Sequence, residues 1–269
     1  MPFKDLAILL AQILKIRAMA LMEEFKKQGD FLFKYRSFFP LPIFLFGFGI
    51  HLYSQYTSNG EIIPEYFFAI SFAVSFLGLI ARSLVIGYVP KNTSGRNTKT
   101  QIANVLNTKG MYSIVRHPLY IGNFLMWLGI AMLTANVWFV LLFLLFYWLY
   151  YERIMYAEEA FLRDKFGQDY LNWADTVPSF IPKLSQWQKH DNFFSFKNVL
   201  RREYTGLFFM VIIFAFFHYA HAVIQAQMCF IPQTLASYIW IGAFAFIVIF
   251  YFTIRFLHKK TSVLKVDGR

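Results

Sequence analysis

The residues of this 269-residue sequence that are best suited to chemistry lie in two stretches. The first, residues 110–123, reads GMYSIVRHPLYIGN and carries Arg116 and His117; the second carries the adjacent acids Glu158 and Glu159, followed by FGQDY at 166–170. A guanidinium can hold a carboxylate or a phosphate through two parallel hydrogen bonds. A carboxylate can bind ribose hydroxyls, an amino group or a cationic sulfur. Together the stretches predict an active site for a small charged molecule.

The residues around this basic half support the same interpretation. Pro118 suits the first turn of a helix, where its missing N–H costs nothing, and the free N–H groups of that turn attract anions. Tyr112 and Tyr120 add hydroxyls and stacking faces. Each residue also has an ordinary explanation, since Arg116 and His117 could be membrane anchors and the acidic pair a solvated helix face. The combination, rather than any one residue, favours a site.

The composition places this site in a membrane protein. Hydrophobic residues make up 58% of the chain and aromatic residues 21%, whereas soluble domains are about 45 to 50% apolar. The net charge of +11 comes from basic residues that flank apolar runs, which suits membrane orientation and anionic lipid headgroups better than nucleic acid. The single cysteine, Cys229, can form no internal disulfide and is expected to be a small apolar filler.

The apolar runs predict an all-α, polytopic integral membrane protein with about six transmembrane helices. Residues 134–136, short and uncharged, must join spans three and four in a tight helical hairpin. An amphipathic helix over 5–27, with Asp5 as a possible N-cap, is expected to lie on the membrane surface, with a partner-binding helix as the alternative. The expected spans are 42–56, 66–89, 119–133, 137–151, 205–224 and 235–257.

The loop charges predict the orientation. Lys and Arg crowd the N-terminal region, the loop after span two, the segment after span four and the tail, and they are absent from the loops around Glu61, Asn136 and Pro232. By the positive-inside rule, both termini and both large polar segments are expected to be cytoplasmic. We divide the chain into an amphipathic segment (1–40), a transmembrane core with the cytoplasmic site (41–187), and a C-terminal linker, two-helix extension and basic tail (188–269).

The hairpin also predicts relative depth. Two helices that rise ~1.5 Å per residue from a turn between Ala135 and Asn136 place equidistant residues at similar heights. Arg116 is then level with Met155, and Tyr112 is level with Glu159. The basic and acidic halves are therefore expected to face each other at the cytoplasmic membrane boundary.

One ordered combination of residues resembles a known superfamily. Its centre is RHPLYIG at 116–122, which Gly110 and Tyr112 precede. After it come the acidic pair, Leu162, Phe166-Gly167, Tyr170 and Val177-Pro178. This known superfamily is the membrane methyltransferase superfamily of isoprenylcysteine carboxyl methyltransferases and phospholipid N-methyltransferases. The resemblance covers roughly residues 95–182. It implies S-adenosylmethionine as methyl donor in a cytoplasmic pocket, and a lipid or lipidated acceptor that arrives from the bilayer.

Residue roles follow from the resemblance by position. It implies that Arg116 and Glu159 are catalytic, with Arg116 orienting an anionic oxygen of the acceptor or the donor carboxylate. It leaves the division of roles between Arg116, Glu158 and Glu159 open. Gly122, with Gly129 one heptad later, could instead belong to a packing stripe of small residues. The residues implied to bind the donor are Tyr112, His117, Pro118, Tyr120, Gly122, Glu158 and Glu159.

Other features leave alternatives open. A membrane reductase of the sterol-reductase type, which uses a reduced nicotinamide cofactor, has a similar Arg-His-Pro and acidic pair, and a non-catalytic membrane scaffold is a third possibility. The acceptor could be an isoprenylcysteine, a phospholipid amine or a lipid phosphate. Arg82, inside span two, could bind an acidic headgroup or snorkel, and the polar loop 92–101 could be a lid or a plain connection. His218 and His221 lack further metal ligands nearby and are expected to be hydrogen-bonded packing residues, so we expect no metal site.

Overall fold

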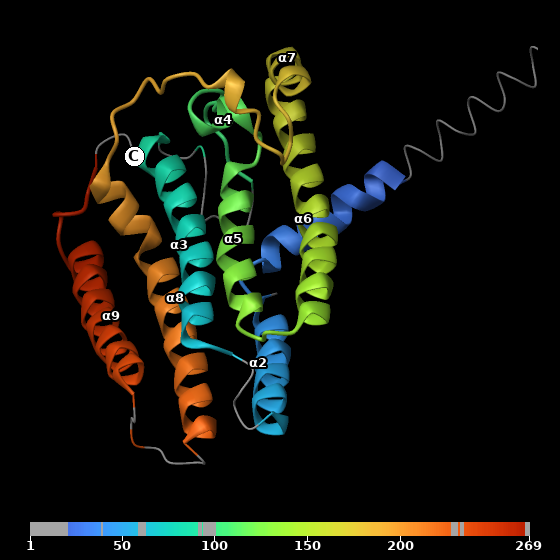
Figure 1. Ribbon diagram of the computed structural model, residues 1–269. Helices are drawn as coiled ribbons and strands as arrows, with labels where there is room; N and C mark the ends of the chain where they lie inside the picture. The colour runs from blue at the N-terminus through green and yellow to red at the C-terminus, as the bar shows by residue number, and fades with distance from the viewer. Residues whose placement is uncertain are drawn as a thin grey trace, which may run out of the picture.

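The apolar runs of the sequence form long helices, as the computed structural model shows (Figure 1). It describes residues 21–38, 40–58, 63–90, 93, 101–226, 231 and 234–266. No strand occurs among these residues, and the protein is an all-helical polytopic membrane protein. Its helices are Leu21–Tyr35, α2 (Pro40–Thr57), α3 (Glu65–Tyr88), α4 (Met111–Ile114), α5 (Pro118–Met132), α6 (Val137–Phe166), α7 (Gln168–Thr176), the 3-10 helix η1 (Leu184–Gln186), α8 (Phe196–Gln225) and α9 (Leu235–Lys260).

The six expected spans correspond in order to α2, α3, α5, α6, α8 and α9. Of these, α3, α6, α8 and α9 are long and apolar enough to cross a membrane alone. The helix Leu21–Tyr35 and α2 qualify only as a pair, and they are bent by 71° at the break between them. The 15 residues of α5 reach only about 22 Å at ~1.5 Å per residue. Six crossings thus remain a prediction, and composition and length support four individually.

Small residues bring α3 and α5 into close contact. A Cβ atom at Gly129 would lie 2.3 Å from the carbonyl oxygen of Ser71, and one at Gly78 would lie 2.5 Å from the carbonyl oxygen of Gly122. The Ser75 hydroxyl donates to the carbonyl oxygen of Met126 at 2.7 Å. Close approach of backbones through small residues is the usual device of membrane helix pairs. It fixes α5, which begins at the site, against α3.

The helical hairpin α5–α6 forms as expected. Ala135 has a positive φ of 47° at the turn, and the side-chain oxygen of Asn136 accepts a hydrogen bond from the Phe139 N–H at 3.0 Å, which caps α6. The rings of Tyr120 and Tyr151, which are equidistant from the turn, lie 5.0 Å apart. The depth argument therefore holds within the two helices.

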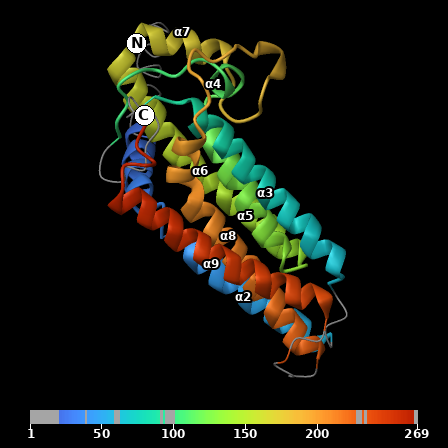
Figure 2. The ribbon, with the colours of Figure 1, turned by 90° about the vertical axis from the view of Figure 1, so that its left-hand side faces the viewer.

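The bundle has two distinct ends (Figures 1 and 2). We call the end that carries α4, α7 and η1 the site end. The large polar segments and the C-terminal residues after α9 lie there as well, where Leu264 packs with Tyr204 of α8. The two segments and the tail thus share one end, as the loop charges require. α9 is the outermost helix and packs on α8.

The helix Leu21–Tyr35 runs across α6. A Cβ atom at Gly29 would lie 2.1 Å from the carbonyl oxygen of Arg153, and the Tyr150 hydroxyl donates to the carbonyl oxygen of Leu32 at 3.1 Å. Only the last part of the expected amphipathic helix can be compared with this arrangement. The expected N-cap Asp5, residue Cys229 and most of the loop 92–101 lie outside the described residues.

The two histidines of α8 pack as expected near the far end of the bundle. His218 Nε2 lies 3.0 Å from Glu65 Oε2 of α3, and His221 Nδ1 lies 2.6 Å from Gln55 Oε1 of α2. These hydrogen bonds join three helices, which confirms the prediction that the histidines are hydrogen-bonded packing residues. Among the described residues no cluster of three or more metal-ligating side chains has a geometry that could hold a metal ion.

Candidate active site

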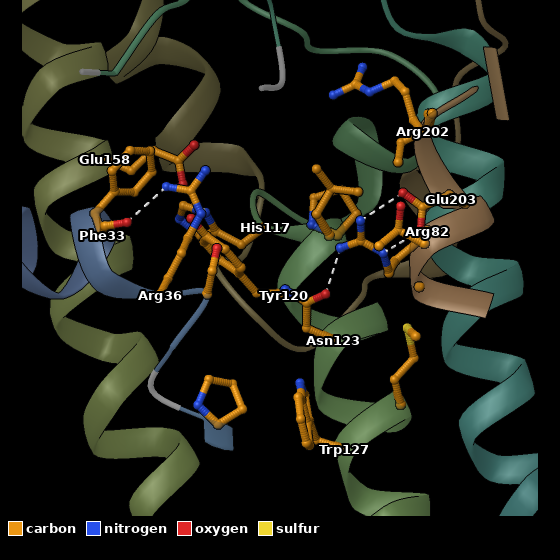
Figure 3. Close-up of a pocket in the computed structure, with 18 of the residues that line it drawn as sticks. Phe33, Arg36, Arg82, His117, Tyr120, Asn123, Trp127, Glu158, Arg202 and Glu203 are labelled. Carbon is orange, nitrogen blue, oxygen red and sulfur yellow. Dashed lines mark hydrogen bonds and ion pairs between the residues drawn. The ribbon is translucent and has the colours of Figure 1, made fainter. Parts of the chain in front are cut away.

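A cavity of about 1290 Å³ opens between the helices toward the site end. Its walls come from the segment 101–107 and from α2, α3, α5, α6 and α8. The volume exceeds the roughly 300 to 1,000 Å³ of a typical small-molecule pocket, so the cavity has room for more than one ligand. Figure 3 shows two polar clusters at opposite sides of it, one around Glu158 and His117 and one around Arg82 and Glu203.

Backbone pairing positions the basic half of the first cluster. The N–H of Arg116 donates to the carbonyl oxygen of Pro178 at 2.8 Å, and the N–H of His117 donates to that of Ser179 at 3.2 Å. Between α4 and α5 the chain is extended at Val115, with φ −158° and ψ 140°. The stretch 110–117 is therefore held by the segment that follows α7. The position of the basic residues thus depends on the chain that follows the acidic pair.

The Arg116 guanidinium has hydrogen-bond partners in three residues. Its Nε donates to Glu159 Oε1 at 2.8 Å, and one terminal nitrogen donates to the carbonyl oxygens of Ala174 at 2.6 Å and Val177 at 2.8 Å. The expected pairing of basic and acidic halves is therefore correct. The partner lies one helical turn beyond Met155, because Arg116 precedes α5 and follows the extended residue Val115. Arg116 lines the cavity, yet most of its hydrogen-bonding capacity ties α7 to α6.

His117 is buried between the two acids. Its Nε2 lies 2.9 Å from Glu159 Oε1, and its Nδ1 lies 3.6 Å from Glu158 Oε2. Burial lowers the pKa of His117, but the hydrogen bonds and negative charges of Glu158 and Glu159 outweigh it and raise the pKa above its ordinary 6.5. The imidazolium, with a donor on each ring nitrogen, suits a position between two carboxylates.

The adjacent acids have different surroundings. Glu158 lines the cavity, and 34% of its side chain is exposed; Glu159 is not among the lining residues, and 18% of its side chain is exposed. Arg36, at the end of the helix Leu21–Tyr35, reaches into the same part of the cavity and lies beside Glu158 (Figure 3). Glu158 is thus placed to meet a ligand, and Glu159 is placed to hold Arg116 and His117.

The other residues singled out from the sequence divide in the same way. Tyr112, Pro118 and Tyr120 line the cavity together with His117. Gly122 faces α3 instead, where a Cβ atom would lie 2.4 Å from Arg82 Cγ. The resemblance implied contact between Gly122 and the donor, but the structure gives this residue a packing position, because α5 turns this side toward α3.

The second cluster was missed by sequence reasoning. Arg82 of α3 donates to both carboxylate oxygens of Glu203 on α8, at 2.7 and 2.8 Å, and to Asn123 Oδ1 of α5 at 2.5 Å. Arg82 therefore has an ion-pair partner inside the bundle, which neither headgroup binding nor snorkelling had included. The one local signal was a charged residue inside an apolar run. Its partner stands 121 positions later, at the polar start of α8.

The fold and this site define a polytopic helical membrane protein with a large internal cavity that has ion pairs at its site end. Residues 91–169 match the family model described as phospholipid methyltransferase. The protein-S-isoprenylcysteine O-methyltransferase of Schizosaccharomyces pombe is 42% identical over 30% of this chain and 34% of its own length. The probable protein-S-isoprenylcysteine O-methyltransferase of Oryza sativa subsp. indica is 33% identical over 45% of this chain and 64% of its own length. The cobalt-zinc-cadmium resistance protein CzcN of Cupriavidus metallidurans is 34% identical over 32% of this chain and 39% of its own length.

These matches place the segment 91–169 in the membrane methyltransferase superfamily. The chain covers less than two thirds of the length of each of the three relatives. No solved structure matches it.

Proposed function

We propose that the protein transfers a methyl group from S-adenosylmethionine to a lipid or lipidated acceptor at the cytoplasmic membrane face. The observation that carries this proposal is the single cavity that joins Glu158, His117 and Tyr120 at its polar side to apolar walls between the helices. The segment 91–169 supplies much of the polar wall. The names of the isoprenylcysteine O-methyltransferase relatives support the chemistry.

The lining residues fit such a donor. S-adenosylmethionine supplies a methyl group on a sulfonium, and it carries an ammonium, a carboxylate and ribose hydroxyls. In the proposal, Glu158 accepts from the ribose hydroxyls or faces a cationic group, and Arg36 beside it holds the carboxylate. Tyr112 and Tyr120 supply aromatic faces.

Arg116, His117 and Glu159 then act through position. They fix the start of α5 and the end of α7 around the donor, so that Glu158 and Tyr120 keep their orientation. An acceptor oxygen or nitrogen forms a bond to the methyl carbon while the carbon–sulfur bond breaks, and the bonding electron pair remains on sulfur. The chain's task is alignment of the three atoms and exclusion of water.

The orientation is part of the proposal. Both large polar segments and the C-terminal residues lie at the site end (Figure 1), and these segments carry the Lys and Arg that the positive-inside rule assigns to the cytoplasm. A donor in the cytoplasm would therefore enter the cavity directly, and an acceptor would enter from the membrane.

The test is a binding assay on the full chain purified in detergent. S-adenosylhomocysteine is expected to bind, and NADPH is not. Glu158→Gln is expected to weaken S-adenosylhomocysteine binding about tenfold, since a hydrogen bond to a charged group contributes ~1.5–3 kcal/mol. Glu152→Gln, a more exposed acid on the same helix, is the matched control and is expected to bind as wild type does. Binding of NADPH alone would favour a reductase, and binding of neither would favour a scaffold.

A further inference from the structure

One face of α8 lines the cavity along about half of the helix. Arg202, Gly206, Phe209, Ile213 and Phe216 all line it, and their spacing of four, three, four and three residues places them on one stripe of a helix. At ~1.5 Å per residue, the stripe is about 21 Å long from Arg202 to Phe216. It has a guanidinium at the site end and apolar side chains below it.

Apolar side chains from α2 and α5 face this stripe. Leu41 and Phe44 near the start of α2, and Trp127 and Ile130 of α5, line the same cavity. The rings of Phe48 and Phe216 lie 4.6 Å apart and close the lower end between α2 and α8. The result is an apolar chamber that is closed at the end far from the site end and polar at the site end. Its shape and length suit a hydrocarbon chain.

The exposure of two lining residues indicates an opening in the side of the chamber. Phe209 and Leu41, one on each helix, are both 55% exposed, although both line the cavity. α9 packs on another side of α8, with the rings of Tyr251 and Phe208 4.2 Å apart. In a membrane, the exposed side chains at this opening would face lipid, so a lipid chain would need to cross no polar barrier to enter.

Positive charge gathers at the upper end of the stripe. Arg201 and Arg202 both line the cavity there (Figure 3 labels Arg202), and Arg201 also donates to Asn198 Oδ1 at 2.8 Å. The neighbouring carboxylate of Glu203 is already held by two hydrogen bonds from Arg82. A guanidinium has five N–H donors and can bind an anion beside other contacts. The top of α8 is therefore suited to a negatively charged group.

Building on the function proposed above, we propose that α8 carries the acceptor subsite. Arg201 and Arg202 bind a carboxylate or phosphate of a lipid headgroup, and the lipid chain lies along Gly206, Phe209 and Ile213. α8 lies outside the segment that matches the methyltransferase family. The substrate class follows: a lipid with a net negative headgroup, in preference to a zwitterionic lipid whose charge is balanced.

The test uses the full chain in detergent and native mass spectrometry of bound lipid. The wild-type protein is expected to bind dioleoyl phosphatidic acid at least about tenfold more tightly than dioleoyl phosphatidylcholine or phosphatidylethanolamine, as one charge-assisted contact predicts. Arg201→Gln/Arg202→Gln is expected to abolish this preference. Lys197→Gln, which removes an exposed positive charge from the same helix, is expected to retain it.

Two further measurements complete the test. Competition with headgroup analogues shows whether the lipid chain contributes to binding, and S-adenosylhomocysteine binding separates the α8 subsite from the proposed function on which it rests. Inorganic phosphate and glycerol 3-phosphate are expected not to displace phosphatidic acid; displacement would overturn the chain subsite. The double arginine variant is expected to bind S-adenosylhomocysteine within about twofold of wild type, which also shows that it is folded. If that binding persists and the lipid preference is unchanged, the α8 subsite is wrong while the proposed function stands. If no form binds S-adenosylhomocysteine but the preference follows the arginines, the proposed function is wrong and the lipid site stands.

Discussion

The two adjacent acids of α6 provide the sharpest comparison, because the structure gives them different tasks. We predict that Glu159→Gln lowers the stability of the fold, whereas Glu158→Gln chiefly weakens donor binding. Both substitutions remove one charge at neighbouring positions and keep the size of the side chain. They differ in what the carboxylate contacts, since Glu159 holds Arg116 and His117 and Glu158 faces the cavity.

The magnitude follows from these contacts. Glu159 Oε1 receives charge-assisted hydrogen bonds from Arg116 at 2.8 Å and from His117 at 2.9 Å. A glutamine keeps the acceptor oxygen but removes the negative charge that strengthens both bonds, which is expected to cost about 1.5–3 kcal/mol of unfolding free energy. For a chain somewhat larger than 150 to 250 residues, this corresponds to a fall in Tm of roughly 3 to 12 °C. Glu158 lies 3.6 Å from His117 Nδ1 and also interacts with Tyr120 and Arg36. Because 34% of its side chain is exposed, the same change there is expected to lower Tm by less than Glu159→Gln does.

The assay is thermal unfolding of the full chain in detergent, followed by size-exclusion chromatography of the protein that remains folded, with S-adenosylhomocysteine binding measured in parallel. Glu159→Gln is expected to show the larger fall in Tm. Glu158→Gln is expected to show the larger loss of S-adenosylhomocysteine affinity when each variant is measured 20 °C below its own Tm. The reverse order in both assays would refute the division of roles, and equal effects in both would show that the acids act as one unit.

Three further predictions follow from other contacts. The folded-state pKa of His117 is raised above 6.5, so its ion pairs contribute fully below about pH 6.5 and are lost as the pH rises through that higher pKa. Tm should therefore fall as the pH rises above 6.5, and this fall should be absent in His117→Asn. Removing one partner of the buried Arg82–Glu203 pair, as in Glu203→Gln, should lower the free energy of unfolding by about 3–5 kcal/mol. A double-mutant cycle with Arg82→Met should give a coupling energy of at least about 1 kcal/mol, and additive losses would contradict the pairing. Gly129→Ala should lower Tm because its Cβ would lie 2.3 Å from a backbone oxygen of α3. Gly49→Ala, whose Cβ would have no neighbour within 4 Å, should leave Tm unchanged or raise it slightly. Equal shifts in Tm would contradict the α3–α5 packing.

Much of the helical architecture could be predicted because hydropathy is a local property. The six apolar runs and the uncharged turn at 134–136 correspond to helices and a hairpin in the right order. The helix α6 continues beyond the expected span 137–151, through charged residues to Phe166, where hydropathy falls but helical hydrogen bonding persists. The shortness of α5 reflects Pro118, whose position at the helix start was predicted correctly.

The sequence predicted which residues gather at the candidate site better than it predicted which of them pair with each other. The depth argument assumed one continuous helix before Pro118, but the extended residue Val115 shifts Arg116 from Met155 to Glu159. The packing position of Gly122 matches the small-residue stripe that was the alternative to donor contact. The Arg82–Glu203 pair depends on how α8 folds back onto α3, and no local pattern in the sequence contains that information.

The most direct test of the central claim is methyl transfer itself. The purified full chain is incubated with S-adenosylmethionine labelled in the methyl group and with a total native lipid extract, and the labelled species are then identified. We expect label in a lipid or lipidated species, and at least about tenfold less label with Glu158→Gln at a donor concentration well below saturation. Label in no lipid fraction and on no peptide, with protein that binds S-adenosylhomocysteine normally, would contradict it.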